Sequence, residues 1–132
     1  MRSKPLLMRN PFLRTAGPRF VDREELLVLA RETAQRIALA QPHVLKVILF
    51  GSFARGDYGT RSDLDLLVVL GQSDKPARDR LADFLQYTPN YPMDIFPLTQ
   101  SEIESRLREG DPFLRRAMRE GILVYPAPDS AR

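Results

Sequence analysis

Two aspartates separated by one residue, Asp63 and Asp65, open an apolar run that ends at Leu70. Acidic side chains are rarely buried unless they are paired or bind a metal. Residues i and i+2 of a strand point to the same face, which would place these two positions about 6–7 Å apart along the backbone. Such a pair of carboxylates predicts a site for a hard divalent cation such as Mg²⁺, together with substrate phosphates.

A third acid, Asp94, lies between Met93 and Ile95 in another short apolar segment. If that segment is a strand beside the one that carries Asp65, its carboxylate can join the other two. Three carboxylates can hold two Mg²⁺ ions, which activate an attacking hydroxyl and stabilise charge on a transferred phosphoryl group. The alternative is a strand end with solvent-exposed acids, and the residues alone leave both interpretations open.

Gly51-Ser52 follows the preceding apolar run and predicts a phosphate contact. Glycine lets the backbone approach a ligand closely, and a serine at the start of a helical turn offers a hydroxyl and an N–H to an anion. The alternative is an ordinary strand-to-helix turn with a serine cap. The pair is not a Gly-x4-Gly-Lys-Ser/Thr phosphate loop, because that spacing and the lysine are missing.

Arg55 and Ser62 complete the pattern between the glycine and the aspartates. The guanidinium of Arg55 could contact a phosphate or pair with Asp63 or Asp65, and both roles remain open. Ser62 is expected to shape the loop by bonding its own backbone.

Composition limits the chemistry that these residues can perform. The 132 residues suffice for one domain, the chain has no cysteine, and its single histidine is His43. Thiolate chemistry, disulfides and multi-histidine metal sites within one chain are therefore excluded. No apolar stretch is long enough to span a membrane and the N-terminus does not resemble a secretory signal, so a cytoplasmic location is expected.

Charge is concentrated at the N-terminus. Five basic residues and no acid lie in residues 1–20, so the remainder carries a small net negative charge within a total of +3. The domain is therefore not a basic body of the kind that binds nucleic acid. We expect a basic, irregular extension over residues 1–20, one domain over residues 21–126, and a tail over residues 127–132.

Four apolar segments predict strands that would position the acids. They lie at residues 44–50, 64–70, 93–96 and 122–125. Strands alternate with helical patterns, which favours an α/β layered domain. The connection between the first two strands is short for a parallel crossover, so parallel and mixed sheets both remain open.

Helical patterns fill the intervals between these strands. A helix is expected to begin at Asp22 and end near Pro42, with one buried stripe, and a brief helical turn is expected over residues 52–56. Thr99 with Glu102 predicts a capping box, and Asp111 caps a last helix. The stripes expected to be buried comprise Leu26, Ala30, Ala34 and Ile37; Ile103 and Leu107; and Phe113, Leu114, Ala117 and Met118. A further helix, capped by the turn at residues 73–76, is expected to carry Ala77, Leu81, Phe84 and Leu85.

The combined pattern resembles a known signature. Gly51-Ser52-Phe-Ala-Arg55-Gly56, then Ser62-Asp63-Leu-Asp65-Leu66, is similar to the DNA polymerase beta-like nucleotidyltransferase superfamily, and most similar to its minimal nucleotidyltransferase (MNT) branch. The resemblance extends over residues 22–125 and implies an α/β (α+β) nucleotidyltransferase fold, with a small mixed sheet flanked by helices.

The resemblance also implies roles for the matched residues. Gly51 and Ser52 would grip the triphosphate of ATP, with Arg55 and Ser62 beside them. Asp63 and Asp65 would bind both Mg²⁺ ions, and Asp94 would bind the ion that activates the acceptor hydroxyl. The reaction implied is transfer of AMP with release of pyrophosphate. Larger relatives carry an acceptor-binding domain for which this chain has no room, so another molecule is expected to present the acceptor.

Three functions follow from the resemblance. The first is an antitoxin that transfers AMP to a tyrosine of a helical HEPN-domain toxin, which fits the short chain. The second is a nucleotidyltransferase acting on a small molecule of the aminoglycoside type, a role in which a dimer could complete the pocket. The third is a non-catalytic antitoxin that neutralises its partner by binding alone.

Overall fold

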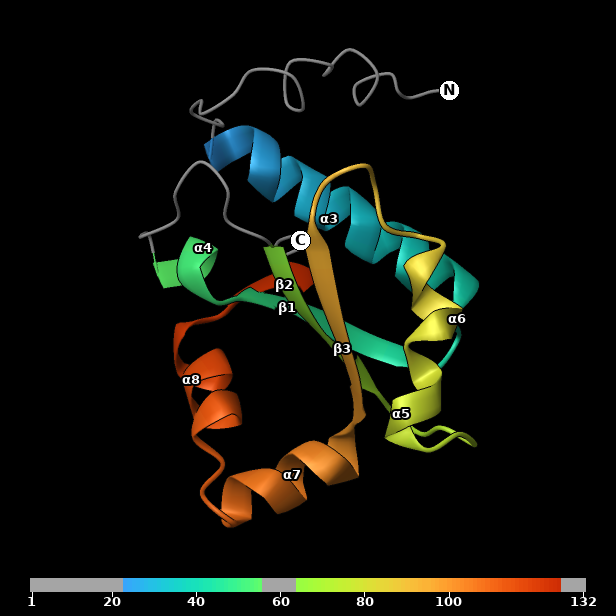
Figure 1. Ribbon diagram of the computed structural model, residues 1–132, viewed down its shortest axis with the longest axis vertical. Helices are drawn as coiled ribbons and strands as arrows, with labels where there is room; N and C mark the ends of the chain where they lie inside the picture. Colours follow the sequence, from blue (N-terminus) through green and yellow to red (C-terminus); the bar gives the residue numbers. More distant parts are fainter. Residues whose placement is uncertain (1–22, 56–63, 127–132) are drawn as a thin grey trace.

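The structure, a computed structural model, describes residues 23–55 and 64–126, and for Ser52 and Arg55 it describes the backbone alone. Within these ranges four strands form one sheet in the order β3-β2-β1-β4. The strands are β1 (Val44–Phe50), β2 (Leu64–Leu70), β3 (Met93–Thr99) and β4 (Ile122–Tyr125). The predicted bounds of β1, β2 and β4 are confirmed, and helices cover both faces of the sheet (Figure 1).

The sheet is mixed. β1 pairs antiparallel with β2 and with β4, whereas β2 and β3 run parallel. This arrangement follows from the connections, because antiparallel neighbours tolerate a short connection whereas parallel strands need a longer crossover. The crossover from β2 to β3 contains the two short helices α5 (Ala77–Arg80) and α6 (Ala82–Leu85).

One face of the sheet packs against α3 (Arg23–Ala40). The predicted stripe of Leu26, Ala30, Ala34 and Ile37 is buried there against apolar side chains of β1 and β2. Successive residues of a strand point to opposite faces, so Leu64, Leu66, Val68 and Leu70 face α3 and their neighbours in β2 face away. The expected cap at Asp22 lies outside the described residues.

The opposite face packs against α7 (Gln100–Arg108) and α8 (Pro112–Glu120). The capping box of α7 is confirmed, since Thr99 accepts a hydrogen bond from the Glu102 N–H and the Glu102 carboxylate accepts one from the Thr99 N–H. Asp111 caps α8 as predicted, accepting from the N–H groups of Phe113 and Leu114. These two short helices therefore begin where their sequences predict.

The helix predicted to follow residues 73–76 is formed as two short helices, α5 and α6, and only part of its apolar set is buried. Leu81 and Leu85 are 39% and 50% exposed, whereas Arg80 and Phe84 are buried. Arg80 turns inward because its guanidinium forms a two-pronged ion pair with Glu102, at 2.7 and 2.8 Å, and donates to the Pro97 carbonyl at 3.1 Å. A buried arginine is stable only when paired, so this contact fixes which face of the segment points inward.

β3 also differs from expectation, because it continues through Pro97 to Thr99 instead of ending at Phe96. A proline is tolerated on an edge strand when its missing N–H faces away from the sheet. Here the Pro97 carbonyl accepts from Arg80 and therefore points away from β2. The nitrogen of a strand residue points to the same side as its carbonyl, so the Pro97 nitrogen also points away from β2. The proline therefore interrupts no hydrogen bond of the sheet.

The predicted buried face of α8 is half confirmed. Leu114 and Ala117 are buried, but Phe113 and Met118 are 41% and 38% exposed. A helix of nine residues that covers one corner of a sheet buries a narrower stripe than the sequence pattern suggested. One consequence is that Phe113 presents part of its ring to solvent.

Candidate active site

Asp65 and Asp94 lie side by side in the sheet. The parallel register pairs Asp65 of β2 with Asp94 of β3, and the antiparallel register pairs Phe50 of β1 with Asp65. The Leu64 N–H donates to the Pro92 carbonyl at 3.1 Å, which fixes this register just before both acids. Because paired strands lie about 4.8 Å apart, the two carboxylates emerge next to each other.

Both acids point to the face that carries α7 and α8. Leu66 and Ile95, one residue beyond each acid, belong to the core on the α3 side, whereas Leu67 and Phe96 contact the opposite core. Alternation along each strand therefore places Asp65 and Asp94 on the α7–α8 side. Asp65 is half-buried and Asp94 is exposed. Among the described residues, no hydrogen bond or ion pair involves the Asp94 carboxylate.

Gly51 lies directly against the carboxylate of Asp65. It has a φ of +85°, a left-handed conformation that glycine adopts without a steric penalty. A Cβ at this position would clash with Oδ2 of Asp65. The glycine therefore serves two purposes, since it turns the chain from β1 into α4 (Ser52–Arg55) and leaves room for the Asp65 carboxylate.

The short helix α4 is held by a contact that the sequence analysis missed. The Arg23 guanidinium lies over the Phe53 ring, 4.6 Å from its centroid, and donates to the Phe53 carbonyl at 3.2 Å. Phe53 itself is fully buried. A cation over an aromatic face is a stabilising arrangement, so Arg23 positions the turn that follows Gly51. An arginine at the beginning of a helix gives no sequence signal for such a contact.

Three phenylalanines form an aromatic cluster beside the acids. The ring centroids of Phe50, Phe96 and Phe113 are 5.3–5.5 Å from one another, with tilted or edge-on planes. Such separations fall in the range that favours aromatic pairs. Phe96 lies two residues after Asp94 on the same face, so this cluster forms an apolar border to the acidic site. In the sequence these rings appear only as members of separate apolar segments.

The remaining predicted site residues are only partly described. Asp63 and Ser62 lie outside the described residues, and so does the loop predicted over residues 56–62. The backbone of Ser52 and Arg55 forms α4, which confirms the predicted helical turn over these positions. The structure therefore brings Gly51, Asp65 and Asp94 together, and the roles of Ser52, Arg55, Ser62 and Asp63 stay predictions.

The donor set fits a hard divalent cation. Asp65 and Asp94 supply adjacent carboxylate oxygens, the ligands that Mg²⁺ prefers. Within residues 23–55 and 64–126, no group of three or more metal-ligating side chains is present. Asp63 precedes Asp65 by two residues and would be the third ligand, as the sequence predicts.

No helix in the described part of the chain is both long and apolar enough to cross a membrane.

Comparisons with known proteins agree with this geometry. A family model described as "Nucleotidyltransferase domain" matches residues 30–124. The "Putative protein adenylyltransferase MJ0604" of Methanocaldococcus jannaschii is 35% identical over 83 residues, which cover 62% of this chain and 79% of the relative.

A solved structure is similar as well. The "Crystal structure of a putative nucleotidyltransferase from Sulfolobus solfataricus" matches with a TM-score of 0.59 and 27% identity, covering 76% of this chain and 80% of that one. The matched residues 30–124 contain Gly51 and both described acids, Asp65 and Asp94. The chain belongs to the nucleotidyltransferase domain family.

Proposed function

We propose that this protein is a Mg²⁺-dependent adenylyltransferase that transfers AMP from ATP to a hydroxyl of a partner protein, a tyrosine of a HEPN-type toxin. The observation that carries the chemical part of the proposal is the pairing of Asp65 with Asp94 on one face of the sheet. Two carboxylates on neighbouring strands repel each other, and a bound cation would offset that repulsion. The relative named as a protein adenylyltransferase supports a protein acceptor.

The residues of the chain divide the work in this proposal. Gly51 leaves room for the Asp65 carboxylate at the turn into α4, and Gly51 and Ser52 would contact the phosphates of the nucleotide. Asp63, Asp65 and Asp94 would hold Mg²⁺, which when bound lowers the pKa of the acceptor hydroxyl and offsets the charge of the phosphates. The acceptor oxygen forms a bond to the α-phosphorus, the bond from that phosphorus to the bridging oxygen breaks, pyrophosphate leaves, and the hydroxyl proton passes to solvent.

A labelling experiment tests the proposal. The full chain is incubated with Mg²⁺, with ATP labelled in the α-phosphate, and with the helical protein encoded beside it, and the partner is analysed by mass spectrometry. We expect one tyrosine of the partner to gain AMP, and we expect Asp94→Asn to abolish the transfer. Asp74→Asn is the matched control, because Asp74 is an exposed acid remote from the site and should leave transfer unchanged.

Other outcomes would contradict the proposal. If the partner gains no label and Asp94→Asn still neutralises it, the protein acts by binding alone. If label moves to an aminoglycoside and not to the partner, the acceptor is a small molecule.

A further inference from the structure

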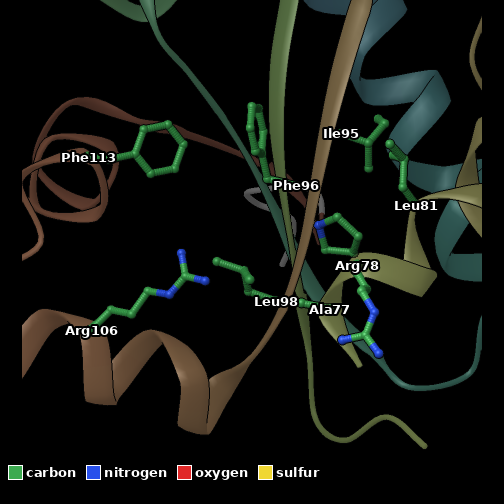
Figure 2. A pocket seen from close by; sticks show the side chains of 9 residues that line it. Ala77, Arg78, Leu81, Ile95, Phe96, Leu98, Arg106 and Phe113 are labelled. Carbon is green, nitrogen blue, oxygen red and sulfur yellow. The ribbon is translucent and has the colours of Figure 1, made fainter. Parts of the chain in front are cut away.

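A groove follows the free edge of β3 beside the acidic site. It has a volume of about 340 Å³ and lies between α5 on one side and α7 and α8 on the other. Figure 2 shows Leu81 and Ile95 on one side of the strand and Phe96, Arg106 and Phe113 on the other. The lining residues are Ala77, Arg78, Leu81, Ile95, Phe96, Pro97, Leu98, Arg106 and Phe113.

The groove begins next to the residue that would bind the activating ion. Ile95 directly follows Asp94, and Phe96 lies on the same face as Asp94 at a distance of about 6–7 Å along the strand. A peptide segment bound in the groove would therefore lie within a few residues of Asp94. This continuity distinguishes the groove from the smaller hollow at the other end of β2, which His43, Leu70 and Lys75 line.

The walls of the groove are apolar and open to solvent. Leu81 and Phe113 are 39% and 41% exposed, although both are large apolar side chains. Pro97 and Leu98 form part of the floor. The volume lies near the lower end of the ~300–1,000 Å³ typical of ligand pockets, so the groove suits one or two side chains of a longer partner.

Two arginines give the groove a positive charge. Arg78 on α5 and Arg106 on α7 both line it and are exposed. In the described part of the chain, neither guanidinium forms an ion pair or side-chain hydrogen bond. Neighbouring cations differ, because Arg80 is paired with Glu102 and Lys75 with Asp83. Unpaired arginines beside an apolar surface favour a partner that carries carboxylates.

The backbone of β3 limits how a partner can bind. The carbonyl of Pro97 already accepts from Arg80, Pro97 has no N–H, and the N–H of Thr99 donates to Glu102. A peptide that added to this edge as another strand would need these groups. Recognition must therefore use side chains in the groove instead of a continuous ladder of backbone hydrogen bonds.

We propose that this groove docks a segment of the acceptor protein in which an aromatic or aliphatic side chain is flanked by acidic residues. The inference rests on the proposed transfer to a protein and specifies how that protein is recognised. The apolar side chain would fill the space beside Leu98 and Phe113, and the acids would pair with Arg78 and Arg106. RNA fits less well, since backbone binding uses many cations and much of this surface is aliphatic.

A binding experiment without ATP tests the groove separately from the reaction. The probe is a short fluorescein-labelled peptide with one tyrosine, two leucines and several glutamates, and its counterpart has lysine at every glutamate position. We expect the full chain to bind the acidic peptide at least about tenfold more tightly, measured by fluorescence anisotropy, which corresponds to about 1.4 kcal/mol. We expect Arg78→Glu/Arg106→Glu to remove this preference.

Arg108→Glu/Arg116→Glu is the matched control. It reverses the same number of charges on exposed arginines of α7 and α8 that do not line the groove, and it should retain the preference. Both double variants should keep the rise in Tm produced by Mg²⁺ and ATP, which shows that the fold and the nucleotide site are intact. If Arg78→Glu/Arg106→Glu loses transfer but keeps the rise in Tm, the groove binds the acceptor. If the nucleotide site itself fails, the rise in Tm is lost as well.

Three results would overturn the inference. The first is equal binding of the acidic and basic peptides. The second is equal binding of the acidic peptide by the two double variants. The third is displacement of the acidic peptide by an oligouridine RNA, or dimer formation by the chain in analytical sedimentation, if Arg78→Glu/Arg106→Glu abolishes that effect.

Discussion

Asp65 and Asp94 are separated by 28 residues of chain, yet they occupy paired positions in parallel strands. The pairing follows from a single register, which the apolar residues on both faces of β2 fix. A shift of one residue would turn Leu66 and Leu67 to the wrong cores. The same packing that stabilises the sheet therefore sets the geometry of the acids.

Neutralising one of the paired acids should stabilise the protein without nucleotide. Like charges on directly opposed positions of a sheet are destabilising, by about 0.2–1 kcal/mol. We expect Asp94→Asn to raise the free energy of unfolding, measured in urea without divalent cations, by an amount in this range. Asp79→Asn, on the exposed face of α5, should change it little. A loss of stability for Asp94→Asn would show that its carboxylate supports the fold.

Gly51 is the second residue at which fold and site cannot be separated. Alanine there is strained by the positive φ, which costs about 1–3 kcal/mol, and its Cβ clashes with the Asp65 carboxylate. We expect Gly51→Ala to lower stability and to abolish AMP transfer. Gly110→Ala is the matched control, because Gly110 has a φ of +83° but its Cβ would meet only the end of the Arg115 side chain.

The Gly110→Ala control separates the backbone strain of a positive φ from the displacement of the Asp65 carboxylate. Gly110→Ala should lose stability and retain transfer. Equal residual activities in the two alanine variants, after correction for the fraction folded, would show that the room left for the Asp65 carboxylate is not needed.

At the scale of the elements, the Arg80–Glu102 pair links α5 to the start of α7. The hydrogen bond from Arg80 lowers the pKa of Glu102 from 4.5 to about 2, with a further contribution from the Thr99 N–H, although burial acts in the opposite direction. The pKa of Arg80 is raised, first of all by the same hydrogen bond. Glu102 therefore both caps α7 and holds a buried cation that lies against β3.

The pH dependence of stability follows from that lowered pKa. A carboxylate whose folded pKa lies below its unfolded value stabilises the fold above pH 4.5, and the contribution disappears as pH falls toward about 2. We expect Glu102→Gln to lower the free energy of unfolding by about 1–2 kcal/mol at pH 7, after discounting for the partial exposure of Glu102. The difference from the wild type, measured by urea unfolding, should shrink steadily below pH 4.5.

A difference between the two proteins that stayed constant from pH 7 to pH 2.5 would contradict this account. It would mean that the carboxylate is not charged and paired in the folded state.

The elements also show what the sequence could and could not predict. β1, β2 and β4 were predicted to the residue, because continuous apolar runs bounded by turn residues leave little choice. The caps at Thr99 and Asp111 were also correct, because capping is local. The burial of Arg80 was not predicted, because its contacts with Glu102 and Pro97 join positions 22 and 17 residues apart. The predicted end of β3 at Phe96 was wrong, because a proline interrupts a strand unless it lies on an edge of the sheet.

The candidate site was predictable to a similar degree. Asp65 and Asp94 lie together, as expected if their strands were neighbours. Alternation along each strand is a local property, but the pairing of β2 with β3 is not, and the sequence left it open. The aromatic cluster, Arg23 and the groove were not predicted. Each depends on side chains from separate elements, whose contacts no spacing in one segment reveals.

At the scale of the molecule, residues 23–55 and 64–126 form a four-stranded mixed sheet with α3 on one face and α7 and α8 on the other (Figure 1). The acids emerge on the α7–α8 face where β1 ends and β2 and β3 begin, beside the turn into α4. The free edge of β3 then continues from the acids into the groove. At this scale the two proposals describe one surface, with nucleotide chemistry at one end and acceptor recognition along it.

The most direct test of the central claim counts the divalent ions that bind with the nucleotide. Mn²⁺ replaces Mg²⁺ in a titration followed by electron paramagnetic resonance, in the presence of a non-hydrolysable ATP analogue. We predict that the wild type binds one ion more than Asp94→Asn, that Asp65→Asn binds none beyond the ions held by free nucleotide, and that Asp74→Asn matches the wild type. Identical ion binding by Asp94→Asn and the wild type would contradict the claim that the paired carboxylates of β2 and β3 form the metal site.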